Sequence, residues 1–272
     1  MHPIYIVLIC VGAFLLLSVL LYLFLAKPGK KRSATDKFLA YKYAHRGLHG
    51  GGVSENSMTA FKKAVDAGYG IELDVRLCKG GELVVFHDPT LKRVCGIDEL
   101  VKSKSADELS KIKLGGTEDT VPRFVDVLKL VDGKIPLLVE IKEEIGETAV
   151  TEKTLEILRE YKGDYMIESF NPFAIALVRK KMPEAVRGFL SQDFMKTKKH
   201  RNIAYFLGQN FVFNVKCRPD FIAYRHSDYR NCAFRLQKLL FKATTVAWTV
   251  KNEREEREAL EHGFKCLIFE EQ

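Results

Sequence analysis

The sequence predicts an α/β protein: a (β/α)8 TIM barrel preceded by one N-terminal transmembrane helix. Two observations predict the barrel. Apolar strand-like runs alternate with helical patterns about eight times, and they do so over roughly 235 of the 272 residues. A doubly wound open sheet is the alternative fold. Its phosphate-binding turn has the spacing GxGxxG, which the stretch GLHGGG after the first strand lacks.

The first element is an apolar run over residues 4–26 that contains no charged side chain. As a helix, its 23 residues reach roughly 34 Å, enough to cross a bilayer core of about 30 Å. A cleaved signal peptide would have a basic start and a shorter apolar segment, whereas Met1, His2 and Pro3 include no Lys or Arg. We therefore expect residues 1–26 to be an uncleaved anchor rather than a signal peptide or a buried core helix.

A basic cluster follows the anchor at once and consists of Lys27, Lys30, Lys31 and Arg32. The positive-inside rule predicts a single-pass membrane protein with its N-terminus outside and the rest of the chain in the cytoplasm. These four side chains supply half of the net charge of +8, so the charge does not indicate a nucleic-acid partner. Residues 27–37 are expected to be a basic linker, and its cations suit anionic headgroups. Six cysteines without CxxC spacing also fit a reducing cytoplasm better than a disulfide scaffold.

The barrel is expected over residues 38–272. Strands are predicted at residues 42–46, 70–77, 83–87, 136–142, 165–170, 185–190, 220–224, 245–250 and 264–269. Helical patterns lie between most of them, at residues 57–67, 122–131, 147–161, 172–181 and 253–262. In the first of these helices Asn56 or Ser57 can form the N-terminal cap, and Gly68 can end the helix. Residues 88–119 interrupt the alternation, so we expect an insertion there, in a loop of the kind that carries function.

Charged residues within the apolar strands are the candidate functional residues. Glu72 and Asp74 lie two positions apart in the strand GIELDVRL, so their side chains share one face and point into the barrel. Glu140 and Lys142 share a face in PLLVEIK in the same way.

Three carboxylates that meet at a barrel mouth repel each other, and burying them unpaired is costly. One divalent metal ion would neutralise Glu72, Asp74 and Glu140. Oxygen ligands suit Mg²⁺ or Ca²⁺, with Mn²⁺ as a further candidate. The alternative is a set of structural salt bridges to nearby basic residues (Arg46, Arg76 and Lys142).

His45 and His87 end two of the predicted strands, in the pairs His45-Arg46 and His87-Asp88. An ordinary histidine pKa near 6.5 suits general acid–base catalysis, and the planar fork of Arg46 suits phosphate oxygens. Together with a metal ion, these residues indicate phosphoryl chemistry. The sequence contains no P-loop and no kinase glycine loop, which argues against nucleotide-driven transfer.

The motifs HRG, ENS, ELDV, HD and EIK, in this order, resemble those of the glycerophosphodiester phosphodiesterase family, and the resemblance covers about residues 41–272. It implies a (β/α)8 barrel with a short inserted subdomain after the HD strand. It also implies an enzyme, a phosphoric diester hydrolase, that uses a metal ion to convert glycerophosphodiesters into sn-glycerol 3-phosphate and an alcohol. The barrel would then be the catalytic domain on the cytoplasmic side of the membrane.

The resemblance also implies roles for the matching positions. Glu72, Asp74 and Glu140 match the metal ligands, and His45 and His87 match the acid–base pair. The remaining matches are phosphate contacts and residues that line the site (Arg46, Lys142, Asn56 and Trp248). Helix capping is an equally good interpretation of Asn56, and a role in the core is as good an interpretation of Trp248.

The implied mechanism has two steps. The glycerol 2-hydroxyl attacks phosphorus while one histidine takes its proton and the other protonates the leaving alcohol, and water then opens the cyclic phosphate. We favour His45 as the first base and His87 as the acid. The last strand departs from the family pattern, because Phe269-Glu270-Glu271-Gln272 stands where the family often has Thr-Asp-x-Pro. Contacts of the eighth loop are therefore open.

Three rival functions remain. The same residues would serve lysophospholipase D activity on membrane lysolipids, with the anchor holding the site near its substrate. A phosphatidylinositol phospholipase C-like barrel also uses two histidines, but the carboxylates Glu72, Asp74 and Glu140 favour the phosphodiesterase family. A membrane-tethered binding module without catalysis is disfavoured, because every matched catalytic position is filled.

Overall fold

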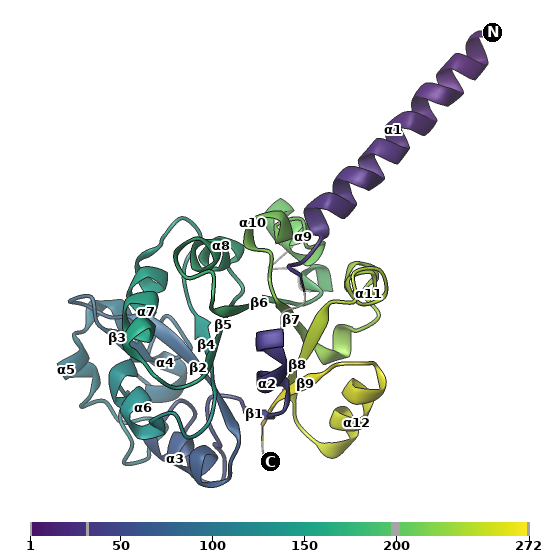
Figure 1. Cartoon of the computed structure of the whole chain (residues 1–272). Helices are drawn as coiled ribbons and strands as arrows, with labels where there is room; N and C mark the ends of the chain where they lie inside the picture. The colour runs from purple at the N-terminus through teal and green to yellow at the C-terminus, as the bar shows by residue number, and fades with distance from the viewer. Residues whose placement is uncertain (1, 31–32, 197–201, 271–272) are drawn as a thin grey trace.

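The computed structural model describes residues 2–30, 33–196 and 202–270 (Figure 1). Eight parallel strands form a closed barrel, in the order β1-β9-β8-β7-β6-β5-β4-β2, and the pairing of β1 with β2 closes it. This confirms the predicted fold class. The barrel strands are β1 (Tyr43–Ala44), β2 (Gly70–Leu77), β4 (Leu137–Ile141), β5 (Tyr165–Ser169), β6 (Val186–Ser191), β7 (Phe221–Arg225), β8 (Thr244–Val250) and β9 (Cys266–Phe269).

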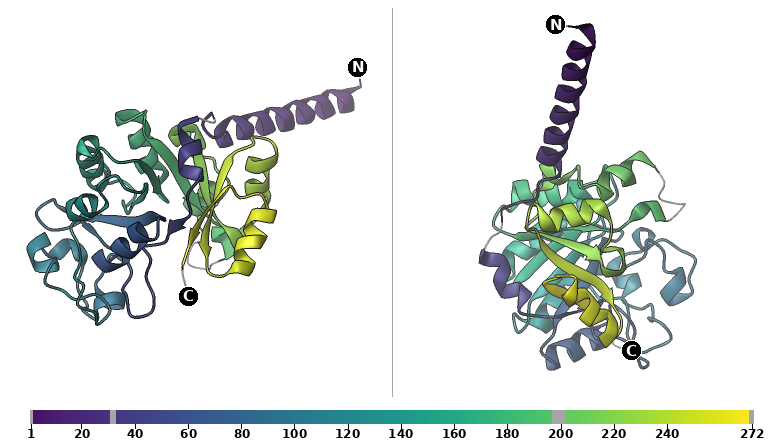
Figure 2. Two further views of the ribbon diagram at one scale, coloured as in Figure 1. Left: turned by 60° about the horizontal axis from the view of Figure 1, so that its bottom comes forward. Right: turned by 90° about the vertical axis from the view of Figure 1, so that its right-hand side faces the viewer.

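Helices surround the barrel and cover the outer faces of its strands, as the views of Figure 2 show. Ser57 caps the first of them, because its hydroxyl accepts a hydrogen bond from the Ala60 N–H at 3.1 Å. Ala60, Phe61 and Ala64 of that helix are fully buried, and Met58 and Val65 are partly buried against the same core. The surrounding helices are α3 (Met58–Asp66), α6 (Phe124–Val131), α7 (Ala149–Glu160), α8 (Pro172–Lys181), α9 (Ile203–Gln209), α10 (Asn214–Cys217), α11 (Cys232–Leu239) and α12 (Glu253–Glu261).

The strand predicted at residues 83–87 does not belong to the parallel barrel. β3 (Leu83–Val85) pairs with β2 alone, and it runs antiparallel to it. The turn between them is closed by a hydrogen bond from the Gly81 N–H to the Cys78 carbonyl at 3.1 Å, and both Gly80 and Gly81 lie at positive φ (93° and 85°), where glycine is favoured. The hairpin extends β2 beyond the barrel mouth and then carries the chain back, so His87 reaches the mouth from above rather than from a barrel strand.

The insertion predicted at residues 88–119 contains three short helices: α4 (Lys92–Cys95), η2 (Val101–Ser103) and α5 (Ala106–Leu109). Its apolar side chains form a small core of their own over the outer end of the hairpin. Val84 and Phe86 contribute to this core together with residues of the insertion (Leu91, Val101, Leu109 and Leu114). The insertion therefore lies on the catalytic side of the barrel, beside the loop that holds His87.

The opposite end of the barrel is closed by the N-terminal segment. α2 (Asp36–Leu39) lies across this end, and its Phe38 packs with side chains of the barrel interior, including Leu138 and Phe221. The stretch expected as a linker, residues 27–37, contains η1 (Ser33–Thr35) and the start of α2. Gly29 within it donates a hydrogen bond to the Pro219 carbonyl at 2.8 Å. Two further short helices lie in the βα loops, η3 (Phe194–Lys196) and η5 (His226–Asp228).

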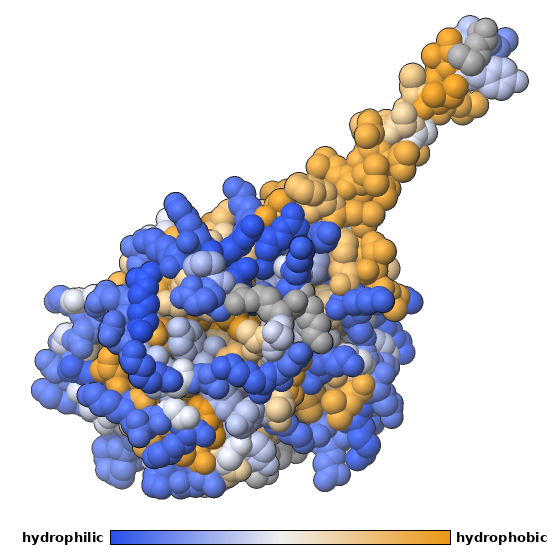
Figure 3. All heavy atoms as spheres, viewed as in Figure 1, coloured by the Kyte–Doolittle hydropathy of each residue, from blue (hydrophilic) through white to orange (hydrophobic). Residues whose placement is uncertain are grey.

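α1 (Pro3–Ala26) projects away from the barrel and is apolar along its length (Figure 3). Among the described residues it is the one helix that is long and apolar enough to cross a membrane, and a signal sequence near an N-terminus has the same properties.

Candidate active site

Three buried carboxylates lie together at the carboxyl ends of β2 and β4. Asp74 and Glu140 are partners in the parallel register of these strands, and Glu72 lies one pleat below Asp74 on the same face. Each of the three can offer one oxygen so that all three oxygens lie within 4.8 Å of one another. The side-chain alternation of the sequence therefore places the predicted acids as expected, and this group could hold a metal ion.

Two basic side chains partly neutralise the carboxylates. Lys142 Nζ lies 2.9 Å from Asp74 Oδ1 and 2.6 Å from Glu140 Oε1, and Arg46 Nε lies 3.3 Å from Asp74 Oδ2. Although burial acts against it, Lys142 and Arg46 hold the pKa of Asp74 below its usual range. Two of the salt bridges considered as an alternative to the metal ion, those of Arg46 and Lys142, thus exist, but Arg76 Nε donates to the His87 carbonyl at 2.8 Å instead. Two cations therefore face three carboxylates.

Glu72 is the carboxylate left in excess. It accepts a hydrogen bond from the Arg46 backbone N–H at 2.9 Å, and the nearest ring nitrogen, His45 Nε2, is 3.9 Å away. Burial, with Asp74 and Glu140 adding to it, raises the pKa of Glu72 well above its usual value. Burial also raises the pKa of Glu140, to about 7. A surplus of buried oxygen ligands fits a hard divalent cation.

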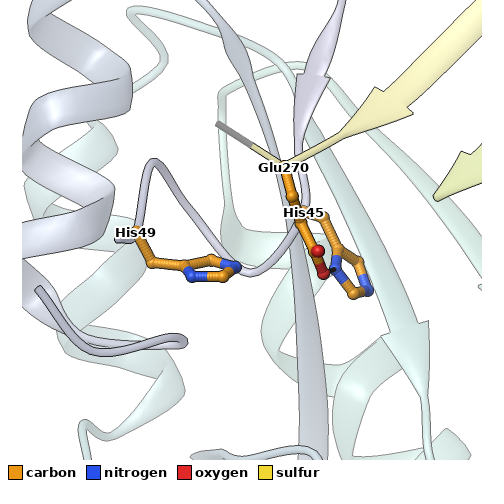
Figure 4. Close-up of side chains that lie close together, drawn as sticks. All are labelled: His45, His49 and Glu270. Atoms are coloured by element: carbon orange, nitrogen blue, oxygen red, sulfur yellow. Dashed lines mark hydrogen bonds and ion pairs between the residues drawn. The ribbon is translucent and has the colours of Figure 1, made fainter. Parts of the chain in front are cut away.

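His45 is held by a carboxylate that was not among the predicted site residues. Its Nδ1 lies 2.7 Å from Glu270 Oε1, at the end of β9 (Figure 4). Burial lowers the pKa of His45, and the bond to Glu270 offsets part of this effect. The bond in turn lowers the pKa of Glu270 to about 2. The ring of His49 lies beside this pair, and His45, His49 and Glu270 can also bring one ligand atom each within 4.8 Å.

His87 has a comparable arrangement. Its Nδ1 lies 2.6 Å from Asp88 Oδ1, and Arg93 Nε of α4 lies 2.6 Å from Asp88 Oδ2. Arg93 also bonds both carboxylate oxygens of Glu55, and Glu55 Oε1 lies 2.7 Å from Arg46 Nη1. Burial lowers the pKa of His87 to about 4. In both histidines a carboxylate engages Nδ1, which leaves Nε2 for a substrate.

Asn56 and Trp248 have different surroundings. Asn56 is buried and donates a hydrogen bond from Nδ2 to Asp74 Oδ2 at 2.8 Å, while the helix cap is Ser57. Asn56 thus supports a carboxylate of the acidic group. Trp248 lines the cavity of the site, and Phe170 packs edge-on against it at a ring-centroid distance of 5.5 Å.

The cavity has a volume of about 110 Å³. It brings together most of the predicted residues with one carboxylate, Glu168 of β5, that was not predicted. Glu168 is buried, and its Oε2 has no hydrogen-bond partner in the part of the chain that the structure describes. The alternation in YMIES, which turns Met166 and Glu168 to the same face, was the signal that could have found it. The cavity is lined by His45, Arg46, Glu72, His87, Glu140, Lys142, Glu168, Phe170, Leu190, Trp248, Thr249 and Ile268.

Solved structures with the same fold include two phosphodiesterases. A phosphodiesterase of Oleispira antarctica, solved with the product sn-glycerol-3-phosphate, superposes with a TM-score of 0.71 at 20% identity and covers 86% of this chain and 94% of its own. A glycerophosphodiester phosphodiesterase of Thermotoga maritima superposes with a TM-score of 0.65 at 24% identity, covering 84% and 94%.

Sequence relatives point the same way. A glycerophosphodiester phosphodiesterase of Caldanaerobacter subterraneus is 35% identical over 186 residues, which are 63% of this chain and 76% of the relative. A lysophospholipase D of Rattus norvegicus is 28% identical over 168 residues, 57% of this chain and 52% of that protein. The profile of the "Glycerophosphoryl diester phosphodiesterase family" matches residues 45–271. The chain therefore belongs to the glycerophosphoryl diester phosphodiesterase family and is an enzyme of that family.

Proposed function

We propose that the chain hydrolyses glycerophosphodiesters to sn-glycerol 3-phosphate and an alcohol, with His45 and His87 as the acid–base pair. The observation that carries this proposal is the convergence, around one cavity, of three carboxylates, two histidines and two cations. A product-bound relative of the same fold, the Oleispira phosphodiesterase, supports the choice of substrate.

Arg46 and Lys142 are proposed to bind the phosphate oxygens. Both line the cavity, and their positions beside Asp74 keep the ammonium and guanidinium charged, since ion pairing outweighs burial and raises the pKa of each. The planar Arg46 fork is held by Glu55, so it is oriented before the substrate arrives.

Glu72, Asp74 and Glu140 are proposed to hold one divalent metal ion, Mg²⁺ or Ca²⁺ with Mn²⁺ as a further candidate. When bound, such an ion stabilises negative charge on phosphate oxygens and orients the phosphodiester. Asn56 supports this group through its bond to Asp74, and its amide cannot add a further negative charge.

The protons move between the substrate and the two histidines. His45 Nε2 takes the proton of the glycerol 2-hydroxyl as its oxygen attacks phosphorus, and the Glu270 carboxylate at Nδ1 stabilises the imidazolium formed. His87 gives a proton to the leaving alcohol. The low pKa of His87 makes its protonated form a strong acid, and a bound phosphate anion favours that form. Water then opens the cyclic phosphate, with the histidines in exchanged roles.

The test is the release of glycerol 3-phosphate from glycerophosphocholine and other headgroup diesters, with and without EDTA. We expect wild-type turnover that EDTA abolishes and that a divalent ion restores. His45→Ala and His87→Ala should each lower kcat by about 10²–10⁴-fold. His262→Ala, far from the cavity, is the matched control. Near-wild-type kcat in either catalytic variant would exclude the two-histidine scheme.

A second candidate substrate class is lysophospholipids, hydrolysed in a lysophospholipase D reaction by the same residues. An aromatic path favours it. From Trp248 and Phe170 in the cavity, rings continue to Phe194 (6.2 Å from Phe170) and Tyr205 (5.1 Å from Phe194). Such a path suits an acyl chain. Comparing turnover of lysophosphatidylcholine and glycerophosphocholine decides between the two classes.

We also propose the cellular arrangement: residues 1–26 as an uncleaved anchor, residues 27–37 as the basic segment and residues 38–272 as the cytoplasmic catalytic barrel. The burial of Ala26 among side chains of the barrel supports retention of the helix. Protease protection in sealed membrane vesicles tests the orientation, and the N-terminal sequence of the mature protein tests retention.

A further inference from the structure

α9 is an apolar helix whose first turn is left exposed by the part of the chain that the structure describes. It reads IAYFLGQ, and its first four residues are all exposed. Ile203 is 71% exposed and Phe206 is 47% exposed. A helix surface of this kind is normally buried against the protein or against a partner of similar polarity.

α9 belongs to the part of the barrel that joins α1. α10, four residues further along the chain, contacts α1 at the end of α1 that meets the barrel (Figure 1). The carbonyl of Ala26, the last residue of α1, accepts hydrogen bonds from Asn214 Nδ2 at 2.8 Å and from Gln237 Nε2 at 2.9 Å. Arg218 donates to the Lys27 carbonyl at 2.5 Å and stacks on Phe24. These contacts fix the direction of α1 relative to the barrel.

α1 has no spacer between its apolar part and the barrel. Its 24 residues reach about 36 Å as a helix, against a hydrocarbon core of about 30 Å. If α1 spans the bilayer, the headgroup layer therefore begins within about one turn of Ala26. The barrel surface around that residue, formed by α10 and α11, must then meet the headgroups.

The charge of this part of the chain suits an anionic surface. Residues 202–252 contain eight Lys and Arg, no Glu and two Asp. Both aspartates, Asp220 and Asp228, are buried, whereas Lys216 and Arg235 are exposed. Elements that bind at a membrane interface typically combine an exposed apolar helix with basic side chains beside it.

We propose that the face formed by α9, α10 and α11 rests on the anionic phospholipid surface of the bilayer that α1 crosses, with Ile203 and Phe206 among the lipids. This inference rests on the proposed membrane anchoring by α1. It adds a second, peripheral contact that fixes the tilt of the barrel on the membrane.

This contact has a consequence for substrate access. α9 follows the loop at the carboxyl end of β6, and its Tyr205 is the outer end of the aromatic path that leads through Phe194 and Phe170 to the cavity. With α9 at the lipid surface, a lipid in the headgroup layer has a continuous aromatic route to the catalytic residues.

The test uses tryptophan fluorescence of the full chain in vesicles that contain brominated phosphatidylcholine and phosphatidylglycerol. The wild-type chain has one tryptophan, Trp248, which supplies the baseline. We expect the fluorescence added by Phe206→Trp to be lost to bromine quenching. The matched control is Leu260→Trp, at an exposed leucine (50%) of α12, and its added fluorescence should stay unquenched.

A second variant tests the charge. Lys216→Glu with Arg235→Glu should reduce the quenching at position 206, since each basic residue near an anionic surface changes the binding equilibrium by about fivefold. Equal bromine quenching of the tryptophan added in Phe206→Trp and in Leu260→Trp would overturn the lipid contact. Unchanged quenching in the charge variant would overturn its anionic character.

Turnover of soluble glycerophosphocholine separates this inference from the proposed function. Phe206→Trp should hydrolyse it as fast as wild type. A wild-type chain without any turnover would contradict the proposed function, whereas absence of quenching in an active chain contradicts the lipid contact alone.

Discussion

At the scale of single residues, one of the two proposed catalytic histidines, His45, bonds a carboxylate that lies far from it in the sequence. His45 and Glu270 are 225 positions apart, yet Nδ1 and Oε1 are 2.7 Å apart because β1 and β9 are neighbours in the barrel. The resemblance to the family left the contacts of the last loop open. In this chain Glu270 occupies that place beside His45.

The Glu270 carboxyl predicts a pH dependence of stability. Its pKa is lowered from 4.5 to about 2, chiefly by the bond to His45, so its contribution is complete above pH 4.5 and is lost as the pH falls towards 2. After allowance for solvent screening, we expect the ionised Glu270 carboxyl to add up to about 2 kcal/mol to the free energy of unfolding. Glu270→Gln should therefore unfold at a lower temperature than wild type at pH 6, and the difference should shrink between pH 4.5 and 3. A difference in Tm that stays constant over this range would contradict the assignment.

Glu168 is a buried carboxyl group, and its Oε2 has no hydrogen-bond partner among the described residues. It lies beside Glu140 in the parallel register, and burial, with Glu140 and Glu72 adding to it, raises its pKa well above the usual value. It is thus a hydrogen-bonding group that faces the cavity and remains available to a substrate.

At the scale of elements, the insertion contributes Asp88 and Arg93 to the surroundings of the site. Arg93 of α4 bonds both Glu55, which orients Arg46, and Asp88, which orients His87. It touches neither the acidic group nor the cavity lining, so it is a positioning residue.

Removing this link should slow catalysis without unfolding the barrel. We expect Arg93→Ala to lower kcat by about 10–100-fold, as for other residues that orient catalytic groups, with a shift of the acid limb of the pH–rate profile. Arg93→Lys should restore part of the rate. The neighbouring Lys92→Ala is the control, because Lys92 pairs only with the exposed Asp98 among the described residues. A loss of kcat without any change in the pH profile would indicate a structural role.

One glycine of β6 and one of α9 allow a matched pair of substitutions. A Cβ at Gly188 of β6 would lie 2.2 Å from the ring of Phe221, whereas one at Gly208 of α9 would meet nothing within 4 Å. We expect Gly188→Ala to lower the free energy of unfolding by about 1–3 kcal/mol through overpacking. Gly208→Ala should raise it by about 0.5–1 kcal/mol through helix propensity. Chemical denaturation of both variants checks this, and equal stabilities would contradict the packing of β6 against β7.

At the scale of the whole molecule, the site combines residues of several barrel strands and of the β2–β3 hairpin around a surplus of negative charge. Burying that charge costs stability unless a cation compensates it. The barrel should therefore be more stable with its metal ion than without it.

Calorimetry after treatment with EDTA tests this dependence. Mg²⁺, Ca²⁺ or Mn²⁺ at about 100 times its Kd should stabilise the chain by about 2.7 kcal/mol and raise Tm accordingly. Glu140→Gln should lose most of this increase, while Glu144→Gln, at an exposed position on the same loop, should keep it. An increase of equal size in both variants would place the ion elsewhere.

The sequence by itself determined the barrel, the apolar N-terminal helix and the positions of Glu72, Asp74 and Glu140. These predictions rest on local periodicity, because alternation along a strand fixes which side chains share a face and parallel strands present their carboxyl ends at one edge. The confirmed barrel shows that such local patterns are sufficient to predict this fold class.

The tertiary structure alone decided which residues meet across the fold. It showed that residues 83–87 return His87 to the mouth as a hairpin, that Glu270 bonds His45, that Arg93 bonds Glu55 and Asp88, and that Glu168 faces the cavity. It also brought α10 against α1. Barrel closure and helix packing bring these residues together over long separations in the chain, and no periodicity of a single segment records such contacts.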